Sequence, residues 1–150
     1  SAQTISSSYA MNHWLREVAH DPQLGVLVRV PPTYFVRESA IEKPSLTPVF
    51  GDAVWVSAGP MATSHPARDI YYGNSRNPGP ALNNIGDLQV ARHGRRGPVR
   101  QSSPVAPGQR LGSWVNNLAC YDGHVERAKL DELWNYYWHK DYQAPTKRPE

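Results

Sequence analysis

The stretch Asn116-Asn117-Leu118-Ala119-Cys120-Tyr121-Asp122-Gly123-His124-Val125-Glu126 decides the fold class of this chain. Its composition predicts a strand over residues 116–126. Asp122-Gly123 near its end is a turn signal, because Gly adopts the backbone angles that tight turns between strands require. A strand needs partners, so the remaining sequence is interpreted as the sheet, loops and cover built around this segment.

An apolar stripe with helical spacing follows the strand. Leu130, Leu133, Trp134, Tyr137 and Trp138 fall at positions i, i+3, i+4, i+7 and i+8. Acidic residues lie at the start of this segment and basic residues at its end, which complements a helix dipole. The pattern predicts one amphipathic C-terminal helix over residues 130–142, packed on a face of the sheet.

Further strands are expected upstream. Residues 49–57 alternate, which would place Phe50, Asp52, Val54 and Val56 on one face. Residues 87–93 form a second expected strand, and residues 33–36 have a strand-like composition. Residues 9–18 fit a strand or a short helix, and periodicity does not decide between them.

Length and composition favour one domain with many turns. The chain has 150 residues, with 14 Pro and 11 Gly, which predicts long loops, here over residues 59–86 and 94–112. Residues 1–8 and 144–150 are expected to be flexible tails. The predicted fold class is therefore α+β: a small antiparallel sheet with long Pro/Gly-rich loops and the C-terminal helix.

Charge and cysteine content exclude several classes. The net charge is +3, and the basic run at residues 92–96 lies in a Gly/Pro-rich segment, which favours a solvated loop over a nucleic-acid-binding stripe. Cys120 is the one cysteine, so no internal disulfide forms, and we interpret it as a small buried apolar residue.

The sequence contains no apolar run of the about 20 residues that a membrane span requires. The longest such run, residues 24–30, is interrupted by Arg29. The chain begins at Ser1 without a methionine, so we expect a piece of a longer protein.

Several segments resemble a known family in the same order along the chain. The resembling segments are residues 8–12, Pro44-Ser45-Leu46-Thr47-Pro48-Val49-Phe50-Gly51-Asp52-Ala53, Ala91-Arg92-His93-Gly94, 117–126, 129–134 and Tyr137-Trp138-His139-Lys140. Together they resemble the prepilin-type processing-associated domain, which is named for a His followed by an Asp-Gly pair and occurs in pseudopilin-like proteins of planctomycetes and verrucomicrobia. His93 and Asp122 are farther apart than the family name implies, so the resemblance requires residues 94–112 to be an insertion.

The resemblance implies a pilin-like globular head without the N-terminal helix. Such a head would be a structural subunit of a type II secretion or type IV pilus-type apparatus, on the periplasmic or extracellular face of the bacterial envelope. Its partners would be other pseudopilin subunits or a secreted protein. The missing N-terminal helix would anchor it, so this part of the protein would make no membrane contact.

Asp52, His93 and Asp122 are the candidate site residues, each on or at the end of an expected strand. With His124 they form a candidate metal site, for Ca²⁺ if oxygen donors dominate or Zn²⁺ if His124 also binds. The alternative is a buried hydrogen-bonded cluster, in which Asp122 accepts backbone N–H bonds at the turn and His93 donates to a carboxylate.

An enzyme is the second functional class. Asp52 and Asp122, with His93, could form the centre of a small hydrolase of glycosidase or esterase type, if the two carboxylates lay about 5–10 Å apart. No Gly-x-Ser-x-Gly, His-Glu-x-x-His or phosphate-binding loop motif occurs in the sequence. The structural role is therefore the preferred interpretation.

Overall fold

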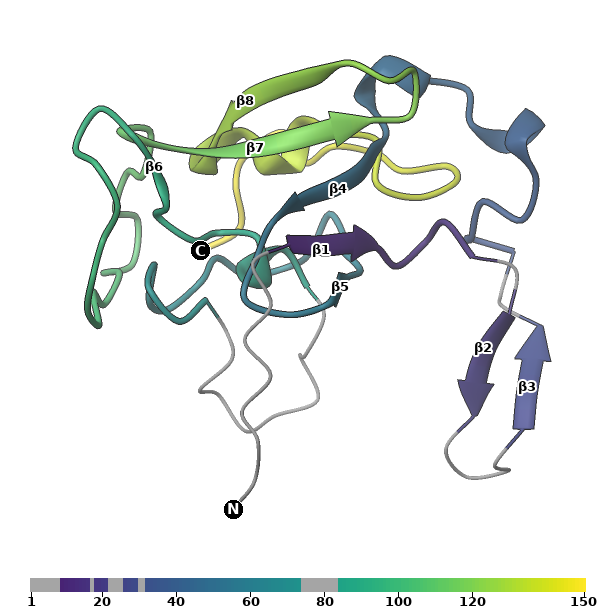
Figure 1. Cartoon of the computed structure of the whole chain (residues 1–150), viewed down its shortest axis with the longest axis horizontal. Helices are drawn as coiled ribbons and strands as arrows, with labels where there is room; N and C mark the ends of the chain where they lie inside the picture. Colours follow the sequence, from purple (N-terminus) through teal and green to yellow (C-terminus); the bar gives the residue numbers. More distant parts are fainter. Residues whose placement is uncertain (1–8, 17, 22–25, 30–31, 74–83) are drawn as a thin grey trace.

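The computed structural model describes residues 9–16, 18–21, 26–29, 32–73 and 84–150, and for residues 18–21 and 26–29 the backbone alone. It is a mostly-β small domain built on a mixed, largely antiparallel sheet of six strands (Figure 1). The strands of this sheet are β1 (Tyr9–Asn12), β4 (Pro48–Asp52), β5 (Ser57–Ala58), β6 (His93–Gly94), β7 (Trp114–Cys120) and β8 (Val125–Lys129).

Strand β7 is the centre of the sheet. Along one edge, β7 pairs with β4 and with β6 at successive parts of its length, and along its other edge it pairs with β8. Strand β4 in turn pairs with β1, and β1 pairs with β5. All pairs in this sheet are antiparallel except β1–β5, which is parallel. Strands β2 (Val18–Asp21) and β3 (Val26–Arg29) form a separate antiparallel pair.

The sequence interpretation of residues 116–126 is partly correct. Strand β7 begins at Trp114 and ends at Cys120, the Asp122-Gly123 turn forms, and the chain returns as β8. Gly123 has φ of 92°, which an L side chain rarely adopts, and this explains why glycine follows Asp122. The single predicted strand is thus the two arms of a hairpin.

The two faces of the sheet differ sharply. Ala10, Gly51 and Leu118 lie opposite one another on β1, β4 and β7, and all three are buried. A Cβ on Gly51 would lie 2.6 Å from Leu118 Cδ2, so only glycine lets the core pack this closely. Ile70, Ile85 and the aromatic residues near the C-terminus complete this core.

The predicted C-terminal helix over residues 130–142 is wrong, and with it the α+β class. A six-residue 3₁₀ helix, η4 (Leu130–Asn135), ends at Tyr136, which has extended backbone angles. Tyr136, Tyr137 and Trp138 are consecutive and all buried. A helical stripe cannot bury three consecutive side chains on one face, so the extended chain packs better here.

Backbone bonds to distant segments replace the missing helical ones. Tyr137 N donates to Leu46 O at 2.7 Å, and Lys140 N donates to Thr33 O at 3.0 Å. The other short 3₁₀ helices are η1 (Glu38–Ala40), η2 (Pro44–Leu46) and η3 (Ile85–Asp87). Among the described residues, no helix is long and apolar enough to cross a membrane.

Three other strand predictions are wrong in whole or in part. The strand predicted over residues 49–57 ends at Asp52, and Val54 N bonds Asp87 O outside any strand. Of the strand predicted over residues 87–93, only His93 lies in a strand, at the start of β6. Residues 88–92 are irregular chain after η3. Residues 33–36 also lie outside the strands.

Of the two predicted flexible tails, the structure describes only residues 144–150. Residues 1–8, predicted to be a tail, lie outside the described residues, as do residues 74–83 of the predicted long loop. At the other end, Arg148 pairs with Asp131 and donates to Gln109 O at 2.8 Å, which attaches the last residues to the domain.

Candidate functional site

Asp52 and His93 meet where β4 and β6 flank β7. Asp52 is buried, and its Oδ2 accepts a hydrogen bond from Asn117 N at 2.8 Å. The Nε2 atom of His93 lies 3.3 Å from the same oxygen, and the His93 side chain is 44% exposed. A buried carboxylate needs such partners, because desolvation of an unpaired charge costs several kcal/mol.

Asn116 fixes the backbone around this carboxylate. Its Oδ1 accepts from Asp52 N at 3.0 Å, and its Nδ2 donates to Asp52 O at 2.6 Å and to Leu88 O at 2.7 Å. Asn116 is fully buried, so the three bonds satisfy its amide without water. This arrangement, called the Asn116 knot below, joins β4, β7 and the chain after η3.

Asp122 and His124 lie elsewhere, at the β7–β8 turn. Asp122 Oδ1 accepts from His124 N at 3.2 Å and lies 2.5 Å from His124 Nδ1. Asn117, which donates to Asp52, lies within β7, whereas Asp122 lies beyond the end of β7 at Cys120. The ion pairs of the described residues therefore join the four candidate ligands in two pairs, Asp52 with His93 and Asp122 with His124.

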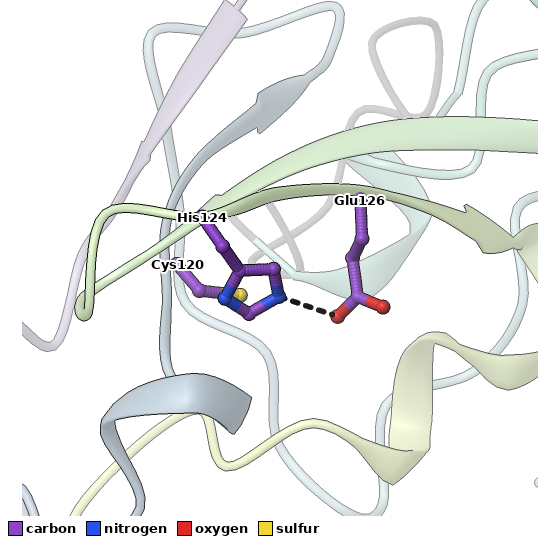
Figure 2. A group of neighbouring side chains, drawn as sticks. All are labelled: Cys120, His124 and Glu126. Atoms are coloured by element: carbon purple, nitrogen blue, oxygen red, sulfur yellow. Dashed lines mark ion pairs between the residues drawn. The ribbon is translucent and has the colours of Figure 1, made fainter.

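A denser group of ligand atoms surrounds His124 (Figure 2). The Sγ atom of Cys120, a ring nitrogen of His124 and a carboxylate oxygen of Glu126 all lie within 4.8 Å of one another. Cys120 ends β7, His124 lies between the strands and Glu126 lies on β8, and the three side chains converge (Figure 2). We call these three residues the hairpin cluster.

The hairpin brings these residues together by simple geometry. The turn places Cys120 beside His124, whose carbonyl accepts from Cys120 N at 2.9 Å. Glu126 is two residues beyond His124, so the two side chains share one face of the strand. That face is the core side, since Glu126 lies opposite the buried Leu118.

Several pKa values are shifted at the hairpin cluster. Burial, with Glu126 and Asp122 nearby, raises the pKa of the Cys120 thiol to about 11. The hydrogen bond to Asp122 is the main cause that raises the pKa of His124, and Glu126 adds to it against the effect of burial. The hydrogen bonds that Asp122 accepts from the side chain and the backbone of His124 lower the pKa of Asp122.

Glu126 also contacts a buried aromatic residue. It pairs with His124 Nε2 at 3.5 Å and hydrogen-bonds the Tyr136 hydroxyl. Burial, followed by this hydrogen bond, raises the pKa of Tyr136, so its phenol stays protonated. The extended segment after η4, rather than a helix, supplies this contact.

Sequence reasoning missed Cys120, Glu126 and Asn116. Cys120 was interpreted as an inert apolar residue, which its burial fits, but its sulfur also faces His124 and Glu126. The signal was the spacing Cys-x-x-x-His-x-Glu around an Asp-Gly turn, since a hairpin there brings these positions to one face. The role of Asn116 depends on Leu88, 28 residues away, and no local pattern shows it.

No protein-family model matches the chain, and no curated protein and no solved structure is significantly similar to it.

Proposed function

We propose that this chain is the globular head of a pilin-like (pseudopilin) subunit of a type II secretion or type IV pilus-type apparatus in the bacterial envelope. Its role is structural, and it acts by contact with other subunits of the same kind. One observation carries the proposal: a row of apolar side chains crosses the outer face of the sheet, opposite the core.

The row follows directly from strand register. Met11 lies opposite Phe50, Phe50 opposite Ala119, and Ala119 opposite Val125, on β1, β4, β7 and β8 in turn. Directly opposite residues share one face of a sheet. Phe50 is 49% exposed and Val125 is 69% exposed.

Other exposed apolar side chains extend this row. Tyr9 precedes Met11 on the same face of β1, and Tyr121 follows Ala119 beyond the end of β7. Both are exposed in this chain. Contiguous exposed apolar surface on a soluble domain is typical of protein interaction sites.

The chemistry of the row favours a protein partner over a small substrate. Arg127 and Lys129 are exposed on β8 beside Val125, so the row has a basic margin. A matching partner would present an apolar strip next to acidic groups. Packing heads side by side in an assembly uses flat surfaces of this kind, with an apolar centre and a polar rim.

Site-specific crosslinking in the source cells tests the proposal. A photo-crosslinking amino acid at Phe50 or Val125 should capture another pilin-like subunit. Such a subunit is recognised by a gene that encodes a cleavable leader followed by an apolar N-terminal helix. The matched control is Val36, which is also exposed but lies outside the sheet. Products at Phe50 and Val125 that are absent at Val36 support the proposal.

Three outcomes would contradict it. A captured secreted protein alone would indicate a cargo-binding role, and capture of neither class would remove the contact role. Fractionation that places the protein in the cytoplasm would also exclude an envelope subunit.

A further inference from the structure

The hairpin cluster combines the three side-chain types that zinc binds most often. It offers a thiol, an imidazole and a carboxylate, all within 4.8 Å of one another. Thiolate, imidazole and carboxylate ligands together are typical of Zn²⁺ and related borderline metals, whereas Ca²⁺ takes oxygen ligands. The donor set therefore selects the class of ion.

The spacing also fits. Two ligand atoms at about 2.0–2.2 Å from a tetrahedral ion lie about 3.4 Å apart. His124 Nε2 and Glu126 Oε1 are 3.5 Å apart. The sulfur needs to lie about 3.5 Å from each, so the remaining separations, at most 4.8 Å, close by little more than about 1 Å.

The surroundings orient the ligands as metal sites require. In the neutral ring, an Nδ1 proton donated to the Asp122 carboxylate would leave the Nε2 lone pair on the side of Glu126. A carboxylate that holds the other ring nitrogen is a regular feature of metal-binding histidines. The Tyr136 hydroxyl hydrogen-bonds the Glu126 carboxylate beside it.

We propose that Cys120, His124 and Glu126 bind one zinc-class divalent ion at the β7–β8 hairpin. Asp122 and Tyr136 position the ligands. A thiolate and a carboxylate balance the two positive charges of the ion. His124 and Glu126 are 41% and 39% exposed, so the ion reaches the site from solvent and keeps one water-filled position.

Binding exchanges a proton for the ion. The Cys120 S–H bond breaks, its proton passes to solvent, and the sulfur electron pair binds the metal. His124 binds through Nε2 in its neutral form, so a second proton leaves wherever the ring was protonated. Affinity therefore rises with pH, as it does at protein thiolate sites generally. The proposal is independent of the pilin-like role.

Zinc titration of the untagged full chain tests the proposal, with a chromophoric chelator as competitor. We expect one equivalent of Zn²⁺ to bind. Glu126→Gln and Cys120→Ala should each weaken binding more than about a hundredfold, and Asp122→Asn about 10–100-fold, as second-layer partners do. The matched control is His93→Gln, a histidine paired with a carboxylate outside the cluster, which should leave the affinity unchanged.

Cobalt gives an independent readout of the sulfur ligand. Co²⁺ at the site should show thiolate charge-transfer absorption that Cys120→Ala abolishes and His93→Gln retains. Glu126 and His124 are exposed, so Glu126→Gln keeps the test valid even where Cys120→Ala disturbs the core. No zinc binding, zinc binding that Glu126→Gln leaves unchanged, or a preference for Ca²⁺ would each overturn the proposal.

Discussion

The Asn116 knot and the hairpin cluster are both polar groups on one strand, yet they are built on opposite principles. In the knot, every polar atom of the Asn116 side chain bonds to backbone, and the result is neutral and fully buried. In the hairpin cluster, a thiol, an imidazole and a carboxylate face one another, and the His124 and Glu126 side chains stay partly open to solvent. Polar groups satisfied by backbone stabilise a fold, whereas groups that only face one another fit a ligand.

The largest expected effect is loss of the knot. Asn116→Leu leaves Asp52 N, Asp52 O and Leu88 O without their partner. Each unsatisfied buried group costs about 1–3 kcal/mol, so we expect the free energy of unfolding to fall by about 3 kcal/mol or more. Urea denaturation measures this.

The neighbouring Asn117→Ala on the outer face is the control, and its effect should stay within about 0.5 kcal/mol. Equal effects for the two asparagines would show that the knot is not special. Zinc affinity of any folded Asn116 variant should match that of the wild type.

Metal addition should stabilise the hairpin cluster and not the knot. At a free Zn²⁺ concentration about a hundred times Kd, binding adds about 2.7 kcal/mol to the stability of the folded state. Thermal melts should therefore shift upward with Zn²⁺ and return with EDTA. His93→Gln should keep the shift and Glu126→Gln should lose it, and a shift in both variants would place the ion elsewhere.

The turn gives a smaller effect that belongs to the hairpin alone. Gly123 has φ of 92°, and an added Cβ would meet no atom within 4 Å, so the strain of Gly123→Ala is purely in the backbone. We expect a loss of about 1–2 kcal/mol. Gly112→Ala is the matched control, because its Cβ would make only ordinary contacts at 3.5 Å or more. A neutral Gly123→Ala would mean that the turn relaxes freely.

The smallest effect is expected at Asp69. It tests whether a carboxylate that accepts backbone hydrogen bonds stabilises the fold, as the Asn116 knot does. Asp69 accepts from Tyr71 N, Tyr72 N, Ser103 N and the Ser102 hydroxyl at 2.6–3.0 Å. Burial raises the pKa of Asp69, but these four bonds outweigh it, and the pKa lies below its ordinary value. A lowered folded pKa stabilises the protein above the unfolded value of about 3.9, and this contribution disappears as pH falls through the folded pKa.

Asp69→Asn should therefore lower stability by about 1 kcal/mol near pH 7, and the gap to wild type should narrow below about pH 4. Urea melts across this pH range measure it. A gap that is constant with pH would mean that ionisation of Asp69 does not contribute.

Local signals in the sequence predicted the hairpin turn and a largely antiparallel sheet. Distant contacts determined where the strands end and why the C-terminal segment is extended rather than helical. Asp122-Gly123 acts within four residues, so its effect could be read directly. The stripe at Leu130, Leu133 and Trp134 also has helical spacing, yet the chain leaves the helix at Tyr136 because Leu46 and Thr33 supply other backbone partners.

The candidate site also combines features that local sequence signals predict with features that depend on distant contacts. Residue types near strand ends singled out Asp52, His93, Asp122 and His124 as one candidate site, but they did not show that these residues form two pairs. Register decides it: Asp52 bonds to Asn117, whereas Asp122 lies beyond the end of β7. Without the register, residue types alone could not show that Cys120 and Glu126, rather than Asp52, lie beside His124.

The extended C-terminal segment has a consequence for the order of folding. Asn12 donates to Trp138 O across 126 residues of chain, and Tyr137 and Lys140 bond segments near residues 46 and 33. Contacts of such long range form late and slowly, since long loops must close first. Asn12 therefore gains this bond only after Trp138 has been synthesised, and a chain shortened before Trp138 would keep the pairing of β1 with β4 but lose this bond.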